Sequence, residues 1–181
     1  MFDNIVIGIV IHKPLTGYDI KKEVQAGIGN FYKASYGSLY PALKRLTTSG
    51  HLSMTEDNSS GRVKKYYVAT DIGRGEFMAW LEAPMDMSSG LNAMVIKIYF
   101  ADELLDDKRN RLFSECEMCC NQVLAGLYEL EKSLENMPDI DDCYRQLSTL
   151  YLGINNLQDT VRWLSHIRER RPLSEFISNL K

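Results

Sequence analysis

Hydroxyl-bearing, aromatic and cationic side chains gather in the stretch YGSLYPALKRL, residues 36–46. Tyr40 and Lys44 lie four positions apart, and Ser38 and Arg45 lie close to them. Such side chains donate hydrogen bonds to phosphate oxygens and base edges, and the cations add attraction to a phosphate backbone. These residue types therefore predict binding of a polyanion rather than catalysis.

A second cationic group, formed by Arg62, Lys64 and Lys65, follows further along the chain. Residues 33–65 contain six Lys and Arg residues against two acids. The formal net charge of the 181-residue chain is nevertheless −3, and the sequence pI is about 5.7. A chain with this overall charge binds nucleic acid only if its positive charge is local, as it is here.

The charge also divides along the chain. Residues 1–83 carry a formal charge of +2, whereas residues 84–181 carry −5. We therefore expect the N-terminal half to hold any surface that binds a polyanion.

A helix is needed to present the first cationic group. Leu39, Leu43 and Leu46 are spaced by four and then three residues, which places them on one face of a helix. With the leucines turned inward, Lys44 and Arg45 fall on the opposite, polar side. Ser38 and Tyr40 fall on its two flanks.

Pro41 lies within this helix. The first N–H groups of a helix have no intrahelical acceptor, so a proline near the start removes little. We expect Gly37 or Ser38 to cap the helix, which would place Pro41 in or beside its first turn. Gly50 is expected to end the helix with a left-handed residue.

The flanking segments predict further elements. An apolar helix is expected from Asp3 to His12, and Thr16 with Asp19 has the form of a capping box for a second helix. After Gly50 the apolar residues alternate, which predicts a two-stranded hairpin around residues 52–69 with an exposed loop at residues 57–61. Thr70 is expected to cap a fourth helix. Helix, helix, helix, hairpin and helix is the order of a winged helix-turn-helix.

The second half of the chain is predicted to be wholly helical, which makes the fold class mainly α. We expect residues 1–83 to be a winged helix-turn-helix domain, residues 84–90 a joint and residues 91–181 a helical domain. Long helices are expected from about residue 107 to 136 and from 141 to about 170. Apolar residues recur at intervals of three or four along both helices, which is typical of a seam for a partner helix. The partner we expect is a second copy of the chain.

Other classes of function find little support in the residue pattern. The sequence has no phosphate-cradling glycine loop, no serine elbow and no clustered histidines and carboxylates with catalytic spacing, so we expect neither an enzyme nor a cofactor. The four cysteines, Cys116, Cys119, Cys120 and Cys143, are interpreted mainly as core residues rather than metal ligands or redox groups. The short apolar N-terminal run does not have the form of a signal peptide, and no stretch is long enough to span a membrane, so a cytoplasmic location is expected.

The runs LTGYDIKKEV, YGSLYPALKRLTTSG and GRVKKYYVATDIGR together resemble the PadR family of transcriptional regulators, in order and without large gaps, over about residues 5–81. This resemblance implies a homodimer that binds pseudo-palindromic operator DNA, usually as a repressor that a small-molecule effector releases. Aromatic residues around the joint are compatible with a small apolar or aromatic effector, but they fit core packing at least as well, so effector residues stay unassigned.

The resemblance also implies roles for single residues. Ser38, Tyr40 and Lys44 would contact DNA from the recognition helix, and Tyr18 would do so from the second helix. Lys64 and Lys65 would contact it from the wing, and the residue pattern adds Arg45 and Arg62. The alternative that the sequence leaves open is a winged-helix module that binds a protein rather than a specific DNA sequence.

Overall fold

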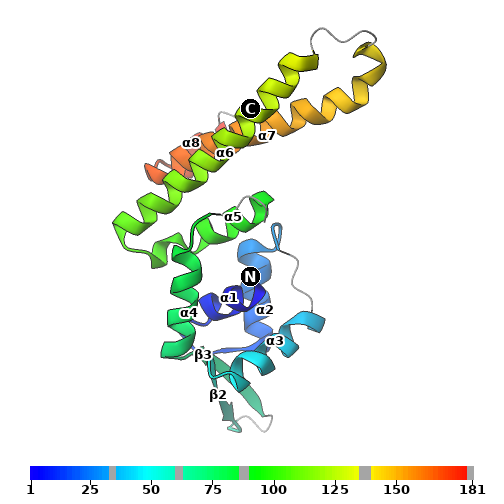
Figure 1. Ribbon diagram of the computed structural model, residues 1–181. Helices are drawn as coiled ribbons and strands as arrows, with labels where there is room; N and C mark the ends of the chain where they lie inside the picture. The colour runs from blue at the N-terminus through cyan, green and yellow to red at the C-terminus, as the bar shows by residue number, and fades with distance from the viewer. Residues whose placement is uncertain (33–35, 60–62, 86–89, 135–139, 179–181) are drawn as a thin grey trace. The chain divides into compact units, whose positions relative to one another are not determined.

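The computed structural model describes residues 1–32, 36–59, 63–85, 90–134 and 140–178. The chain divides into two compact units, residues 1–109 and residues 110–181. Figure 1 shows the elements of each unit: helices with a small sheet in the first, and helices in the second.

The first unit contains the predicted three helices, hairpin and fourth helix in the predicted order, and further elements besides. Its elements are α1 (Phe2–Ile9), β1 (Leu15–Thr16), α2 (Gly17–Ile28), α3 (Tyr36–Thr48), β2 (Leu52–Asp57), β3 (Lys64–Ala69), α4 (Asp71–Glu82), α5 (Gly90–Tyr99) and the 3-10 turn η2 (Ala101–Glu103). The winged helix-turn-helix and its hairpin are therefore confirmed. The mainly α fold class is confirmed as well.

The ends of several elements follow directly from local sequence. The Thr16 side chain accepts a hydrogen bond from the Asp19 N–H and Asp19 reaches back to the Thr16 N–H, so the expected capping box of α2 is present. Gly50 follows α3 with a φ of +76°, the left-handed conformation expected of it. The Thr70 hydroxyl accepts a hydrogen bond from the Gly73 N–H at 3.1 Å and caps α4 as expected.

The described strands form an antiparallel sheet in the order β1-β3-β2. β2 and β3 pair along their whole length, from Leu52 opposite Ala69 to Asp57 opposite Lys64, and make the wing. The two-residue strand β1 was not predicted; Leu15 pairs with Tyr67 and Thr16 with Tyr66. A two-residue strand is too short for its alternation to be recognised in a sequence. Because β1 pairs with β3 and α2 follows it directly, this short strand fixes the start of α2 beside the wing.

The core of the first unit consists of apolar side chains from all its helices and from the base of the wing. Fully buried members include Ile5, Ile7, Ile20, Ile28, Leu39, Leu43, Leu52, Phe77, Leu81, Met94 and Ile96. The three leucines of α3 are all buried, as their spacing predicted.

Helix α5 belongs to this core although the sequence analysis assigned it to the C-terminal domain. Phe100 stacks edge-on against Phe77, with ring centroids 5.2 Å apart. A Cβ built on Gly8 would lie 2.7 Å from the Phe100 ring, and one on Gly27 would lie 2.5 Å from the Tyr99 hydroxyl. Two glycines thus give room for the end of α5 on α1 and α2, and the division into units falls at residue 109 rather than at residues 84–90.

The second unit is a helical hairpin. Its elements are most of α6 (Asp106–Leu134), the 3-10 turn η3 (Ile140–Cys143), α7 (Tyr144–Arg168) and α8 (Leu173–Ser178). Arg168 donates a hydrogen bond to Glu117 at 2.8 Å, and Gln158 donates one to the Tyr128 hydroxyl at 2.6 Å. Both bonds join α6 to α7.

Part of the predicted seam lies outside the core of this unit. Of the apolar residues that formed this seam, Cys116 and Leu164 are fully buried, whereas Val123 and Leu130 of α6 are 40% and 47% exposed. Among the described residues no helix is both long and apolar enough to cross a membrane.

Candidate nucleic-acid interface

Helix α3 presents the predicted polar face. Tyr40 and Lys44 are exposed on it, and Ser38 is half-buried. The helix begins at Tyr36, earlier than the expected cap at Gly37 or Ser38, so Pro41 is its sixth residue and lies in the second turn. Because proline has no N–H, the bond that a residue here would donate to the preceding turn is missing. The leucine face still packs, since it is formed by side chains and not by this bond.

Tyr18 stands at the start of α2, with 64% of the residue exposed. Its position follows from the capping box, because Thr16 and Asp19 fix the first turn that carries it. The Asp19 carboxylate accepts a hydrogen bond from the Thr16 hydroxyl at 2.6 Å as well as from its N–H. The one acid beside Tyr18 in this turn is thus engaged locally.

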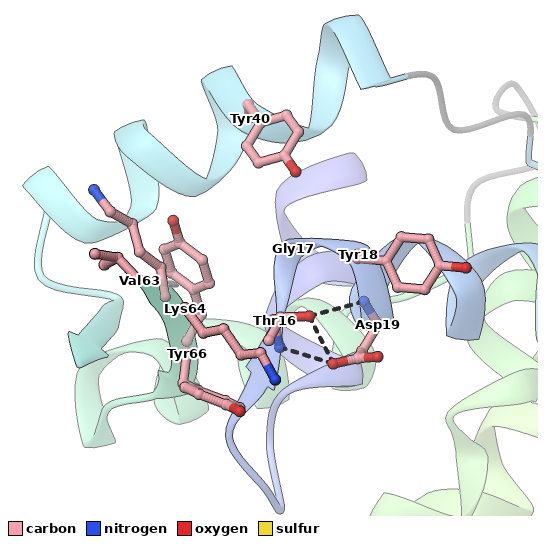
Figure 2. Close-up of a pocket in the computed structure, with 10 residues that line it drawn as sticks. Thr16, Gly17, Tyr18, Asp19, Tyr40, Val63, Lys64 and Tyr66 are labelled. Carbon is pink, nitrogen blue, oxygen red and sulfur yellow. Dashed lines mark hydrogen bonds between the residues drawn. The ribbon is translucent and has the colours of Figure 1, made fainter. Parts of the chain in front are cut away.

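An open groove of about 630 Å³ separates the first turn of α2 from the wing, with Tyr40 of α3 reaching into it. Figure 2 shows Tyr40 pointing from α3 toward the first turn of α2, with the side chains of β3 on the other side. The residues that line the groove are Thr16, Gly17, Tyr18, Asp19, Tyr40, Val63, Lys64, Lys65, Tyr66 and Tyr67. The structure therefore brings together predicted residues from three separate elements: Tyr18, Tyr40, Lys64 and Lys65.

The wing carries charge of both signs. Lys65 lies 3.4 Å from Glu56, its partner on the neighbouring strand, and both side chains are about half exposed. Asp57 accepts a hydrogen bond from the Ser59 N–H at 2.9 Å, and this bond, together with the nearby Lys64, lowers the pKa of its carboxyl group. Lys64 is exposed at the start of β3. Arg62, also predicted to contact DNA, lies outside the described residues.

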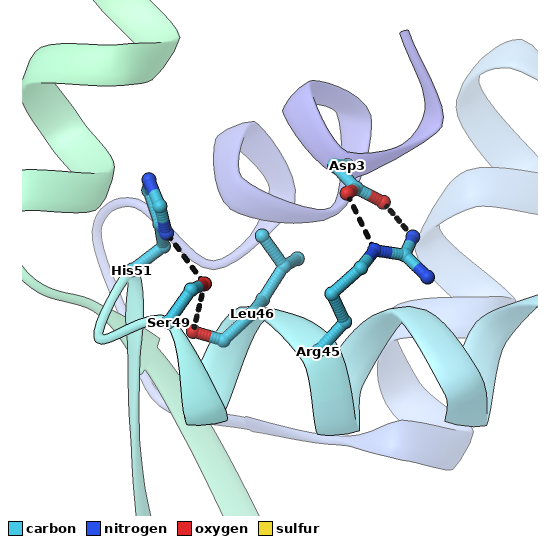
Figure 3. Close-up of polar contacts among 5 residues, drawn as sticks. All are labelled: Asp3, Arg45, Leu46, Ser49 and His51. Carbon is cyan, nitrogen blue, oxygen red and sulfur yellow. Dashed lines mark hydrogen bonds and ion pairs between the residues drawn. The ribbon is translucent and has the colours of Figure 1, made fainter.

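Arg45 lies apart from the groove. Figure 3 shows its guanidinium on the carboxylate of Asp3 in α1, with Nε and Nη2 donating hydrogen bonds of 3.0 and 2.5 Å. Arg45 and Tyr40 are five positions apart on a helix of about 3.6 residues per turn, and so point to opposite flanks of α3. One flank faces α2 and the other α1.

The sequence analysis missed several residues of the groove. Gly17 and Thr16 were interpreted only as part of a helix start, and Val63 and Tyr66 only as strand residues. Val63 is 58% exposed, which is unusual for a valine beside a strand. Its place between Arg62 and Lys64 in the cationic run was the one signal in the sequence.

The cysteines lie in the second unit. Cys116 and Cys120 are buried, Cys119 is partly buried and Cys143 is exposed, and none of these four described cysteines forms a disulfide. Burial, with added repulsion from Cys119 and Glu117, raises the pKa of the Cys120 thiol. Within the described ranges, no group of three or more His, Cys, Asp or Glu residues has an arrangement that could hold a metal ion.

Known proteins resemble the chain over most of its length. It is 27% identical over 169 residues to the negative transcriptional regulator PadR of Bacillus subtilis. The alignment covers 90% of this chain and 92% of the relative. It is 22% identical over 167 residues to the probable transcriptional regulator Rv1176c of Mycobacterium tuberculosis, and this alignment covers 85% of this chain and 88% of the relative.

Solved structures are also similar. Bacillus subtilis PadR in complex with operator DNA covers 93% of this chain and 98% of its own, with 22% identity and a TM-score of 0.48. The same protein in complex with p-coumaric acid covers 93% and 96%, with 24% identity and a TM-score of 0.44. The PadR-like regulator BC1756 of Bacillus cereus covers 99% of both chains, with 23% identity and a TM-score of 0.41.

The family comparison concerns the first unit. Residues 6–79, from α1 to α4, match the model of the transcriptional regulator PadR-like family. This segment contains the groove and every residue that the sequence analysis assigned to DNA binding. By this match residues 6–79 form a domain of the transcriptional regulator PadR-like family.

Proposed function

We propose that this regulator is a cytoplasmic homodimer that represses transcription by binding a pseudo-palindromic operator, and that a small-molecule effector releases it. In each protomer α3 enters the major groove, and the residues of α2 and the wing contact the flanking backbone. The DNA-binding residues proposed are Tyr18, Ser38, Tyr40, Lys44, Arg45, Arg62, Lys64 and Lys65. The proposal assigns no catalytic group, cofactor or metal.

The observation that carries the proposal is the groove between α2, α3 and the wing. Tyr18, Tyr40 and Lys64 come from three elements and line one open surface. Tyrosine hydroxyls and lysine ammonium groups are donors to phosphate oxygens, and an open groove admits the edge of a duplex. A surface of this composition within a PadR-like domain supports DNA as the ligand.

Dimer formation is supported by apolar side chains of the second unit. Met118, Val123 and Leu130 of α6 are 63%, 40% and 47% exposed, and Leu152 of α7 is 59% exposed. Exposed apolar residues that recur along helices are typical of a surface that another helix covers. A second copy of the chain has the same helices to offer, so a closed, symmetric dimer results.

Repression is supported by the description of the Bacillus subtilis relative as a negative regulator. We include an effector because the chain resembles this family, and we assign no residues to its binding site. Trp80 and Tyr99 are partly or largely exposed, which makes apolar or aromatic compounds the first class to screen.

The test is a titration of the protein against duplexes from the region upstream of its own gene and against scrambled duplexes of equal length, at several salt concentrations. We expect tight, salt-sensitive binding to one pseudo-palindromic fragment and weak binding to the scrambled DNA. If the operator lies elsewhere, selection of duplexes by the protein from a random pool identifies the sequence that it binds. If that selection also enriches no sequence, the protein is not a sequence-specific DNA binder, and the protein-interaction module becomes the better reading.

A further inference from the structure

Gly17, the first residue of α2, is buried and lies against Tyr40. A Cβ built on Gly17 would lie 3.1 Å from Tyr40 Cε1, 3.4 Å from its hydroxyl oxygen and 3.5 Å from Leu43 Cδ1. The first of these distances is shorter than ordinary van der Waals contact between carbon atoms. A Cβ at position 17 would therefore press on the tyrosine ring, which would have to move by a few tenths of an ångström.

The backbone of Gly17 does not itself require glycine. The glycines with positive φ among the described residues are Gly50 and Gly90, and Gly17 is not one of them. Alanine is favoured over glycine in a helix, so glycine at the start of α2 is unfavourable for the helix alone. The structural role of Gly17 is the room that it leaves for Tyr40.

The consequence of replacing a glycine depends on whether the atom that its new Cβ would meet belongs to the backbone or to a side chain. At Gly73 a Cβ would lie 2.1 Å from the backbone oxygen of His51, which cannot move without moving the chain. At Gly17 the neighbour is an exposed side chain: Tyr40 is 51% exposed and lines the groove. Because the neighbour is an exposed side chain and not backbone, we expect a substitution at position 17 to shift Tyr40 within the groove and to leave the fold intact.

We propose that Gly17 is a positioning residue for DNA recognition: it lets the Tyr40 ring lie on the first turn of α2 and so fixes where the phenol group meets the duplex. This proposal rests on the proposed function. A Cβ on Gly17 would also lie 3.5 Å from Cδ1 of Leu43, which is buried, so of these two neighbours the exposed Tyr40 is the one expected to move.

The test compares Gly17→Ala, Tyr40→Ala and the double variant, with Gly75→Ala as the control. Gly75 lies in α4 of the same unit, and no atom lies within 4 Å of a Cβ built there. The probe is the duplex that the unaltered protein enriches from a random pool. We expect Gly17→Ala to bind this duplex about tenfold more weakly, while Gly75→Ala binds as the unaltered protein does.

The double variant identifies the route of the effect. If Gly17 acts through Tyr40, adding Gly17→Ala to Tyr40→Ala leaves the affinity of that variant unchanged. An affinity of Gly17→Ala equal to that of the unaltered protein overturns the proposal, and so does an equal further loss in the Tyr40→Ala background. Absence of sequence-specific binding by the unaltered protein instead overturns the proposed function, and with it this role.

A readout without DNA tests the same contact. Fluorotyrosine incorporated at position 40 reports the surroundings of the ring by ¹⁹F NMR, and its resonance is expected to shift in Gly17→Ala but not in Gly75→Ala. An unshifted resonance contradicts the contact. Should Gly17→Ala lower the unfolding temperature, the double variant is expected to restore it, since the overlap is with Tyr40; a failure to restore it would assign Gly17 to the fold alone.

Discussion

Arg45 of α3 donates two hydrogen bonds to the carboxylate of Asp3 in α1. This hydrogen-bonded carboxylate raises the pKa of the guanidinium above its ordinary value. The pair joins α3 to α1 within the first unit. It also places a negative charge beside one of the two neighbouring cations of α3, and leaves Lys44 exposed on the other flank.

The pair predicts unequal effects at two adjacent positions. Because Asp3 offsets part of its charge, Arg45→Ala should weaken binding to duplex DNA less than Lys44→Ala does. Asp3→Asn should strengthen binding to non-specific duplexes, since it removes the acid and releases the guanidinium. Filter binding or fluorescence anisotropy at low salt measures all three. Equal losses for Lys44→Ala and Arg45→Ala would mean that Asp3 does not restrain Arg45 in solution.

The DNA-binding and dimer surfaces should be separable. Tyr40→Ala is expected to weaken operator binding by about 1–3 kcal/mol and to leave the dimer intact, because the residue is exposed in the first unit. Val123→Glu in α6 is expected to dissociate the dimer, since burial of a carboxylate against an apolar partner is unfavourable. Sedimentation equilibrium and DNA titration of each variant decide the assignment. If Tyr40→Ala yields monomers, the face assigned to DNA is wrong.

The wing should contribute an ionic contact. Lys64→Ala is expected to lower the slope of log K against log salt by about 1, the amount for one phosphate contact, and to weaken all sequences alike. The matched control is Lys132→Ala, an exposed cation in α6. Titrations over a range of salt concentrations give both slopes. An unchanged slope for Lys64→Ala would remove this residue from the phosphate contacts.

Two glycine substitutions should change stability in opposite directions. Gly50→Ala is expected to lower the free energy of unfolding by about 1 kcal/mol, since a φ of +76° is unfavourable for a residue with a Cβ although the space there is empty. Gly75→Ala in α4 is expected to raise it by about 0.4–1 kcal/mol, because a helical alanine has less freedom to lose on folding. Urea denaturation measures both changes. A stabilising Gly50→Ala would contradict the left-handed conformation.

The thiols should differ in reactivity. Cys143 is exposed and is expected to react first with iodoacetamide, whereas Cys116 and Cys120 react only after unfolding. The raised pKa of Cys120 keeps its thiol protonated at neutral pH, which slows alkylation further. Mass spectrometry of the native and urea-treated protein gives the order. Fast native modification of Cys120 would reopen the redox role that the sequence analysis disfavoured.

Much of the first unit follows from short stretches of sequence. The Thr16–Asp19 capping box, the Thr70 cap and the left-handed Gly50 were predictable because each depends on a side chain or φ angle within a few residues. The leucine spacing of α3 likewise fixed which of its faces is buried.

Other features arise only when distant segments meet. Strand β1 exists because Leu15 and Thr16 lie against Tyr67 and Tyr66, some fifty residues away in the sequence. Arg45 and Lys44 look alike as neighbours in the chain, and only the packing of α3 on α1 pairs one of them with Asp3. The space that Gly17 leaves for Tyr40 also could not be predicted, because no local sequence pattern indicates how closely two helices approach. The sequence by itself determined the elements, the buried faces and the cationic segment, since these depend on neighbouring residues; the tertiary structure decided which of the exposed side chains share a groove.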